Sequence, residues 1–197
     1  NAVVFKPSEK APATGEFLVL CFHEAKIPQG VVRLLIGGPD EGRALAGQPG
    51  IDGLLFTGSA RAGASLHKQF AETPQKMLAF ELGRKNPLVV WNAKDIDAAA
   101  VIAVQSAFLT AGQRCTAARR LIVEDGHEGP LLAAIGKLLD RLIVDQPFAD
   151  PQPFMGPVID NAAADHVQEQ WLELMMKGGK PLRHLDRIRC DHPMVMH

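Results

Sequence analysis

The sequence has few cysteines, no excess of either charge and no long apolar run, and each shortage excludes a class of protein. Three cysteines at wide spacing in 197 residues are an odd number, so we predict no disulfide framework and expect a reducing compartment, the cytoplasm. Lys plus Arg number 21 against 22 for Asp plus Glu, which gives no electrostatic footprint for nucleic acid and no polybasic membrane anchor. Apolar runs such as Val101 to Val104 are far shorter than the roughly 20 residues of a membrane-spanning helix.

The proportions of apolar and charged residues are those of a globular protein. Apolar residues make up 47% of the chain and charged residues 22%, which is enough to build a core. The length predicts one large domain or two small ones. Because the first residue is Asn1 and an apolar run begins at once at Ala2, we expect a chain cut from inside something longer, with no secretion leader visible.

Short β-rich runs alternate with helical stretches along the chain. This alternation is typical of βα units that stack on a mostly parallel sheet, so we predict an α/β fold. The predicted strands are residues 2–5, 31–36, 53–56, 76–80, 88–91 and 120–123. The predicted helices are residues 12–25, 39–46, 59–71, 96–110, 131–143 and 162–177. Four prolines between Asp145 and Pro157 predict an ordered connection, and little periodicity follows Lys180.

The first segment that could carry chemistry is Phe56 to Gly63, between a predicted strand and a predicted helix. A small, glycine-rich turn at a helix N-terminus offers free backbone N–H groups and the positive end of the helix dipole, which suits a phosphate. The spacing of Gly58 and Gly63 fits neither G-x-G-x-x-G nor a P-loop. The alternative is a plain strand-to-helix turn, with Gly58 as its flexible residue and Ser59 as the N-cap.

Two further segments carry a carboxylate and a thiol. Glu81 ends a strand-like run, where a carboxylate can be a general base or merely solvated. Cys115 lies among arginines, with Arg114 before it and Arg119 shortly after, and this positive context favours the thiolate. The alternative for Cys115 is a small residue buried in the core. Glu81 and Cys115 are far apart in sequence, so only the fold can bring them together.

Three motifs, taken in their order and spacing, resemble the aldehyde dehydrogenase superfamily. They are Phe-Thr-Gly-Ser at 56–59, Glu-Leu-Gly at 81–83 and Gly-Gln-Arg-Cys at 112–115. Val4 to Glu9 resembles that family's adenosine-binding strand and turn, and Met155 to Ile159 resembles its downstream Met-Gly-Pro segment. The resemblance covers about residues 1–177. Within the superfamily, residues 105–120 look most like a bacterial member of arginine catabolism that oxidises a doubly carboxylated semialdehyde.

The resemblance implies a fold and a reaction. A Rossmann-like nucleotide-binding domain would occupy residues 1–81, part of an α/β catalytic domain residues 82–180, and a divergent tail residues 181–197. The family oxidises an aldehyde to an acid through a covalent thioester. Cys115 would be the nucleophile, and its backbone N–H one oxyanion donor. Glu81 would be the general base that activates water, and we expect it in a partly apolar funnel because desolvation makes a carboxylate more basic.

The resemblance assigns six residues to the cofactor: Lys6 and Glu9 at the adenosine ribose, Gly58 and Ser59 near the pyrophosphate, and Gly63 and Leu82 with them. Glu9 favours NAD, because a carboxylate accepts hydrogen bonds from both ribose hydroxyls but repels the 2′-phosphate of NADP. Lys6 nearby would partly offset that repulsion.

The implied partner is a small-molecule aldehyde. Arg114 is a candidate to bind a substrate carboxylate, and a structural ion pair or a charge that tunes the thiolate is the alternative. No metal is expected, since Cys190, His192 and His197 lack the paired short spacings of a zinc site. Full-length members of the family are homo-oligomers, which pair through a β-hairpin domain largely absent from this sequence.

The sequence departs from the family pattern in four places. The family's oxyanion asparagine lies upstream of Asn1, its Glu-x-Phe-Gly-Pro segment is missing, and Arg183 to His197 reads like unrelated sequence. Position 84 is Arg where the family has Gly, so Arg84 would either obstruct the cofactor or swing to solvent. Two alternatives to an active dehydrogenase therefore stay open. One is a catalytically incompetent, nucleotide-binding remnant; the other is a coenzyme-A-acylating relative, against which Glu81 argues.

Overall fold

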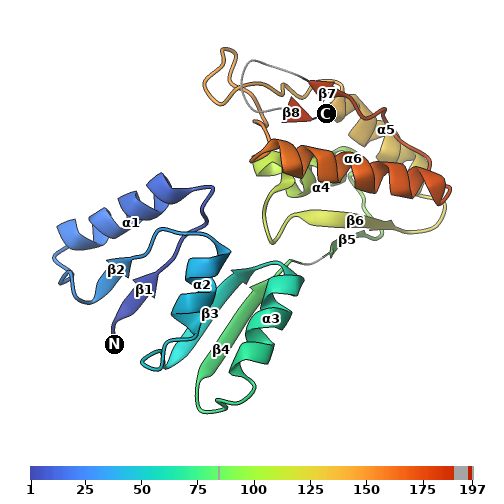
Figure 1. Ribbon diagram of the computed structural model, residues 1–197. Helices are drawn as coiled ribbons and strands as arrows, with labels where there is room; N and C mark the ends of the chain where they lie inside the picture. The colour runs from blue at the N-terminus through green and yellow to red at the C-terminus, as the bar shows by residue number, and fades with distance from the viewer. Residues whose placement is uncertain (84, 189–194, 197) are drawn as a thin grey trace. The chain divides into compact units, whose positions relative to one another are not determined.

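A computed structural model describes residues 1–83, 85–188 and 195–196. It divides the chain into two compact units, Asn1–Gly83 and Arg84–His197 (Figure 1). The predicted domain boundary lay between Glu81 and Leu82, close to this division, and the assignment of nucleotide binding and catalysis to the two parts stays a prediction. Arg84, the tail's Cys190 and His192, and His197 lie outside the described residues.

The first unit is built from two parallel strand pairs. Its elements are β1 (Val3–Phe5), α1 (Pro12–Glu24), β2 (Val32–Leu34), α2 (Pro39–Ala46), β3 (Gly53–Gly58), α3 (Ala60–Phe70) and β4 (Met77–Leu82). Strand β1 pairs with β2 across α1, and β3 pairs with β4 across α3. Parallel strands need such a crossover, because no tight turn can join them. The predicted α/β fold is confirmed, although the strands form separate two-stranded sheets rather than one.

Local signals in the sequence explain where these helices begin. Helices α1 and α2 carry a proline in their first turn, where the missing N–H costs nothing. The Glu41 carboxylate accepts a hydrogen bond from the Gly38 N–H, at 2.7 Å, in front of α2. Ser59 is the N-cap of α3, and its Oγ accepts from the Ala62 N–H at 3.2 Å.

The pair β3–β4 has one covered and one open face. Phe56 and Phe80 pack edge to face, with their ring centroids 6.1 Å apart, against a small core of α2 and α3 residues: Ala46, Leu66 and Phe70. Side chains alternate along a strand, so the neighbouring residues point the other way. On that open face Leu55 is 77% and Met77 60% exposed, and Glu81 is exposed as well.

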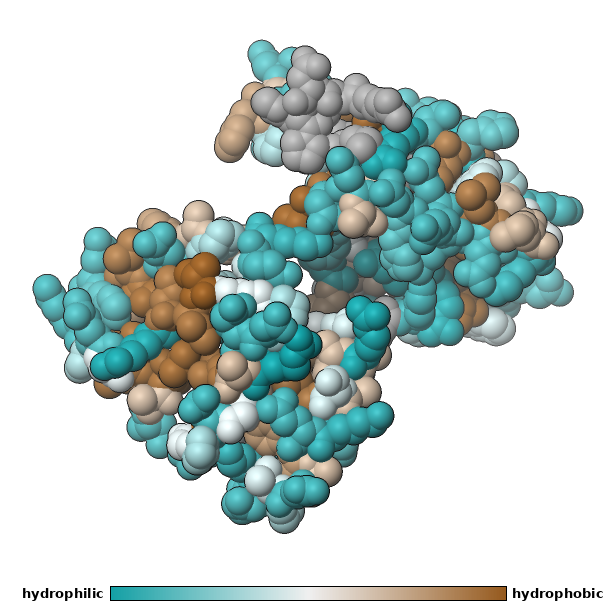
Figure 2. Space-filling view, in the orientation of Figure 1, coloured by the Kyte–Doolittle hydropathy of each residue, from teal (hydrophilic) through white to brown (hydrophobic). Residues whose placement is uncertain are grey.

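Helix α1 and its strands expose a further apolar surface. The apolar side chains gather in the brown area over α1 and the pair β1–β2, at the left of Figure 2. They include Phe17, 69% exposed, and Leu20, 52% exposed, on α1, and Val3, 53% exposed, on β1. The buried side of α1 is formed by Gly15 and Val19, which lie one turn apart.

The second unit contains one further parallel pair and three long helices. Its elements are β5 (Asn86–Val90), α4 (Ile96–Phe108), the 3₁₀ turn η1 (Leu109–Gly112), β6 (Ala118–Val123), α5 (Glu128–Leu139), α6 (Asn161–Met176), β7 (Arg187–Ile188) and β8 (Val195–Met196). Strands β5 and β6 are parallel across α4, and β7 and β8 are antiparallel. Asp95 and Asp160 are the N-caps of α4 and α6, and each carboxylate accepts a backbone N–H of the first turn.

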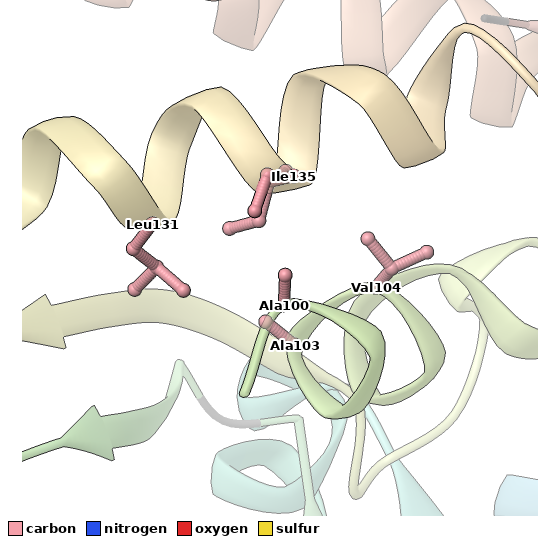
Figure 3. Close-up of a cluster of buried hydrophobic side chains, with 6 residues drawn as sticks. Ala100, Ala103, Val104, Leu131 and Ile135 are labelled. Atoms are coloured by element: carbon pink, nitrogen blue, oxygen red, sulfur yellow. The ribbon is translucent and has the colours of Figure 1, made fainter. Parts of the chain in front are cut away.

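The core of the second unit lies between α4 and α5. Leu131 and Ile135 of α5 point toward Ala100, Ala103 and Val104 of α4 (Figure 3). The two alanines let the helices approach closely, and Leu131 is only 1% exposed. Leu88 and Val90 of β5 and Val123 of β6 pack against the same cluster, and because apolar burial is the main favourable term in folding, the cluster holds the crossover helix on its strands.

Two arginines attach the residues that follow α6. Arg183 donates to both carboxylate oxygens of Asp140, at 3.0 and 2.8 Å, just after α5. Arg187 donates to Asp165 of α6 at 2.6 Å. Although little periodicity follows Lys180 in the sequence, these bonds attach Arg183 and Arg187 to the end of α5 and to α6.

An exposed ion pair lies at the C-terminal end of α6. Lys177 donates to the Glu173 carboxylate at 2.5 Å, and this bond and the lysine charge lower the pKa of Glu173. The pair is exposed, so its contribution to stability is small.

All six predicted strands and all six predicted helices are present. Helix α5 begins at Glu128, three residues before the prediction, because Pro130 lies in the first turn, where a helix tolerates proline. The predicted end of the fourth helix is a 3₁₀ turn, and β7 and β8 were not predicted. The predicted connection around the four prolines is held by a bridge between Val144 and Met155. No helix among the described residues is long and apolar enough to cross a membrane.

The core of the second unit makes a first prediction. Leu131→Ala removes a fully buried side chain, so the free energy of unfolding should fall by about 2–5 kcal/mol. Urea unfolding followed by tryptophan fluorescence measures this, since both tryptophans, Trp91 and Trp171, lie in this unit.

The matched control is Leu132→Ala, on the same helix at a position that is 38% exposed. It should cost less than about 1 kcal/mol. Equal losses for the two variants would show that the contact between α4 and α5 is not the core of this unit.

Candidate active site

The candidate site residues lie at the strand ends of the first unit and, as a separate set, on one turn of the second unit. At the ends of β1 and β2, the Lys6 ammonium donates to the carbonyls of Pro7, at 2.7 Å, and Gly37, at 2.8 Å. This half-buried lysine therefore ties the carboxyl ends of both strands together. Glu9 is exposed in the turn that follows, between β1 and α1, where its carboxylate is open to a ligand.

The ends of β3 and β4 lie side by side at the N-terminus of α3. The Gly83 N–H donates to the Gly58 carbonyl at 3.0 Å. Gly63 is buried against Leu82, since a Cβ added to it would lie 2.6 Å from Leu82 Cδ2. The structure therefore brings together four of the predicted cofactor residues, Gly58, Ser59, Gly63 and Leu82.

Gly58 has a different reason to be glycine than expected. Its φ is not in the left-handed region, so the turn needs no special flexibility. Instead, a Cβ on Gly58 would collide with the ring of Phe56. Glycine lets the backbone pass the ring before Ser59 caps the helix.

Glu81 is the next-to-last residue of β4, where it pairs with Thr57 of β3. Its side chain is exposed on the open face of the pair, opposite to the face that Leu82 packs against α3. The expectation that Glu81 lies in a partly apolar funnel stays a prediction.

Cys115 lies on a tight turn directly before β6. The Ala117 N–H donates to the Arg114 carbonyl at 3.2 Å, so Cys115 and Thr116 are the two central residues of this turn. The cysteine is exposed, and the alternative that it is a core residue is wrong. The thiol is accessible within its own unit, as a nucleophile requires.

The approach to this turn is strained. Thr110, Ala111 and Gly112 have φ values of 58°, 54° and 63°, in the left-handed region. Residues with a Cβ pay about 1–2 kcal/mol there, and such strain is concentrated at functional sites. Glycine is required at 112 for space too, since a Cβ would lie 2.7 Å from the Ala107 carbonyl oxygen and 3.1 Å from Arg119 Nη1.

Arg114 is half-buried beside the nucleophile candidate. Its Nη2 donates to the Gln105 carbonyl at a long 3.5 Å, and its Nε is buried without a partner in the described structure. None of the ion pairs described within residues 1–83 and 85–188 includes Arg114, which leaves the alternative of a structural ion pair without support. A guanidinium with unused donors is suited to bind an anion.

Sequence reasoning missed Asn86, the first residue of β5. Its side-chain amide donates to the Cys115 carbonyl at 2.5 Å and to the Ala117 carbonyl at 3.2 Å. No motif marks such a contact, because it depends on the parallel pairing of β5 with β6. Across the described residues, no group of three or more His, Cys, Asp or Glu side chains could hold a metal ion.

The site residues fall into two sets, one in each unit. The strand-end residues from Lys6 to Leu82 belong to the first unit, and Arg114, Cys115 and Asn86 to the second. The chain belongs to the aldehyde dehydrogenase family, whose model matches residues 1–191. The match passes the predicted limit near Lys177 and enters the segment expected to be divergent, so that limit was too short.

Two bacterial relatives are similar over almost the whole chain. N-succinylglutamate 5-semialdehyde dehydrogenase of Sphingopyxis alaskensis is 58% identical over 99% of this chain and 40% of its own length. The protein of the same name from Novosphingobium aromaticivorans is 54% identical over 99% of this chain and 41% of its own length. The chain thus spans about 40% of the length of these curated relatives. The predicted resemblance to the family and to this member is confirmed.

Solved structures give the same family. A 1-pyrroline-5-carboxylate dehydrogenase matches with a TM-score of 0.88 and 33% identity, over 99% of this chain and 38% of its own. The Thermus enzyme of that name, with bound NAD, matches with a TM-score of 0.85 and 32% identity, over 100% of this chain and 39% of its own. An NAD-dependent aldehyde dehydrogenase from Sinorhizobium meliloti matches with a TM-score of 0.85 and 30% identity, over 95% and 36%.

The strained approach to Cys115 makes a second prediction. Gly112→Ala adds a Cβ where φ is left-handed and where the Ala107 carbonyl leaves no room, so unfolding free energy should fall by about 2–4 kcal/mol. The measurement is urea unfolding followed by tryptophan fluorescence.

Gly126→Ala is the control, since Gly126 also has a left-handed φ, 81°, but open space around its Cβ position. It should lose only the strain, about 1 kcal/mol. If the Gly112 variant loses no more than the Gly126 variant, the crowding at Ala107 is not what requires glycine.

Proposed function

We propose that this chain carries the machinery for NAD-dependent oxidation of a semialdehyde to the acid. The proposed substrate is N-succinyl-L-glutamate 5-semialdehyde and the product N-succinyl-L-glutamate, in arginine catabolism. The observation that supports this most is an exposed Cys115 on a turn whose carbonyls are held by hydrogen bonds, in a chain 58% identical to a protein of that name.

Cys115 starts the reaction by forming a bond to the substrate. Its thiolate adds to the aldehyde carbon and gives a thiohemiacetal, whose oxyanion accepts a hydrogen bond from the Cys115 backbone N–H. NAD, when bound, supplies the acceptor for the hydride that leaves this carbon, and the thiohemiacetal becomes a thioester. The turn keeps the thiol accessible during both changes.

Glu81 acts in the second half of the reaction. Its carboxylate removes a proton from water, the hydroxide adds to the thioester carbonyl, and the C–S bond breaks to release the acid and the Cys115 thiolate. The position of Glu81 on the open face of β4 supports this role, because the carboxylate can face a ligand rather than α3.

The strand ends of the first unit fit a dinucleotide. Glu9 offers an exposed carboxylate for the ribose hydroxyls, and Lys6 fixes the turn before it. Gly58, which brings the backbone past Phe56, and the capped N-terminus of α3 would face the pyrophosphate. Gly63 and Leu82 set how closely α3 approaches β4.

Arg114 is the proposed partner of a substrate carboxylate. Its buried Nε has no partner in the described structure, and a buried donor left unpaired is costly. A carboxylate of a doubly carboxylated substrate would satisfy such a donor through a charge-assisted hydrogen bond.

A second candidate is nucleotide binding without turnover. The exposed Glu81 favours it, because the described residues of the first unit do not enclose this carboxylate. The two functions differ in a single assay, the appearance of NADH.

The third prediction tests the reaction itself. Purified chain mixed with NAD and the semialdehyde should produce NADH, measured by its absorbance. Cys115→Ser should lower the rate by about 10³-fold or more, because a hydroxyl is far less ionised than a thiol. Glu81→Gln should give a burst of at most one NADH per chain, followed by slow turnover, because the thioester is no longer hydrolysed.

Cys21→Ser is the matched control, as Cys21 is also exposed but lies on α1. Its rate should equal that of the wild type. If the wild type binds NAD but makes no NADH, the binding-only function holds; if thioester is released only on adding coenzyme A, the acylating alternative holds.

The fourth prediction concerns cofactor choice. Glu9→Gln removes the charge that would repel a 2′-phosphate, so the Kd for NADPH should fall about 10-fold or more relative to that for NADH. Equilibrium binding of the reduced cofactors, followed by their fluorescence, measures both.

Glu16→Gln makes the same change at an exposed position of α1 and should leave the ratio of the two Kd values unchanged. A Glu9 variant with an unchanged ratio would remove Glu9 from the ribose site.

A further inference from the structure

Asn86 connects the start of β5 to the turn that carries Cys115. Its Nδ2 donates to two carbonyl oxygens, 2.5 Å away on Cys115 and 3.2 Å away on Ala117. A primary amide has two N–H donors, and here each faces a group that can only accept. The orientation of the carboxamide is therefore fixed, with nitrogen toward the turn.

These bonds hold the peptide groups on both sides of the cysteine. The Arg114 carbonyl accepts from the Ala117 N–H at 3.2 Å, which sets the peptide between Arg114 and Cys115. A trans peptide is planar, so the Cys115 N–H points opposite to the Arg114 carbonyl. Asn86 holds the next peptide through the Cys115 carbonyl. The direction of the N–H and that of the Sγ are thus set by the same turn.

Asn86 is itself firmly placed. Its backbone pairs with Ala118 of β6, and its side chain is half-buried. Directly after it the register shifts, because Pro87 lies opposite Arg120 and leaves Arg119 as an extra residue on β6. Such a bulge interrupts regular pairing, which continues from Pro87 to Val90, and bulges are common beside active sites. At this end of the strand pair, the Asn86 side-chain amide supplies hydrogen bonds to the turn that precedes β6, beyond the last backbone pair.

We propose that Asn86 is a positioning residue for acyl chemistry at Cys115. By holding the Cys115 and Ala117 carbonyls, it keeps the thiol and the backbone N–H in the relative orientation that a tetrahedral oxyanion needs. This inference rests on the proposed function, in which Cys115 is the nucleophile, and it adds a residue that the sequence motifs do not include.

The fifth prediction separates positioning from folding by using two probes on the 197-residue chain. Iodoacetamide alkylates a thiol by direct displacement and needs no oxyanion donor. p-Nitrophenyl acetate acylates it: the thiolate adds to the ester carbonyl, nitrophenolate leaves, and a thioester forms through a tetrahedral oxyanion. Mass spectrometry of the Cys115 peptide measures both rates, with Cys21 as the internal standard.

Two variants of nearly equal size remove the amide donors. Asn86→Asp replaces them with a carboxylate facing two carbonyls, and Asn86→Leu removes all polarity. Acylation of Cys115 should fall about 10-fold or more in both, as for the loss of an oxyanion donor, while alkylation should stay within about 3-fold. Asn161→Asp, the same change at the exposed first residue of α6, should alter neither rate.

Amide hydrogen exchange of the Ala117 N–H gives a readout that does not depend on reactivity. It should become faster in both Asn86 variants, because the turn is no longer held from β5. An unchanged exchange rate, or an equal fall of alkylation and acylation together with lost helical circular dichroism, would overturn the proposal. A wild type that is alkylated but never acylated at Cys115 would count against Cys115 as the nucleophile, and the role of Asn86 would fall with it.

Discussion

The need of parallel strands for a crossover determines where the residues assigned to the cofactor lie in the first unit. Each strand runs into a turn and then a helix, so strand ends and helix N-termini meet at one edge of each pair. Two contacts join the paired ends there: Lys6 bonds the Gly37 carbonyl, and Gly83 bonds that of Gly58. Most residues assigned to the cofactor follow β1, end β3 or end β4. Ser59 directly follows β3 as the N-cap of α3, and Gly63 lies inside α3.

In the second unit, the candidate site residues lie at the opposite end of the strand pair. Cys115 precedes β6, and Asn86 begins β5, so the proposed nucleophile lies at the amino ends of these parallel strands. The turn follows a left-handed approach and lies beside a bulge, and the Asn86 amide donates to its carbonyls. Just before the N-terminus of α6, the Ile159 N–H donates to the side-chain oxygen of Gln113 at 2.8 Å, two residues before Cys115. The core between α4 and α5 supplies the rigidity that these strained residues need.

Local patterns were enough to predict the six helices and the first six strands, since apolar spacing and residues such as Ser59 and Pro39 act within a few positions. The position of the Cys115 turn and the role of Asn86 could not be predicted, because they depend on pairing between strands about thirty residues apart. The reason for glycine at 58 was missed for a related cause, since its neighbour Phe56 is held in place by the distant Phe80. The three motifs indicated the family only when they were taken together, in their order and spacing.

In helix α1, a close steric contact rather than a polar side determines the rotation of the helix about its axis. A helix with one polar and one apolar side has a preferred rotation about its axis, but α1 carries apolar side chains all around, and Phe17, Leu20 and Phe22 stay exposed. Gly15 settles the rotation, because only a residue without a Cβ fits against Pro7, whose Cγ lies 2.5 Å from where that atom would be. The angular setting of the whole helix, and with it which apolar side chains face outward, is thus encoded in the absence of a single methyl group.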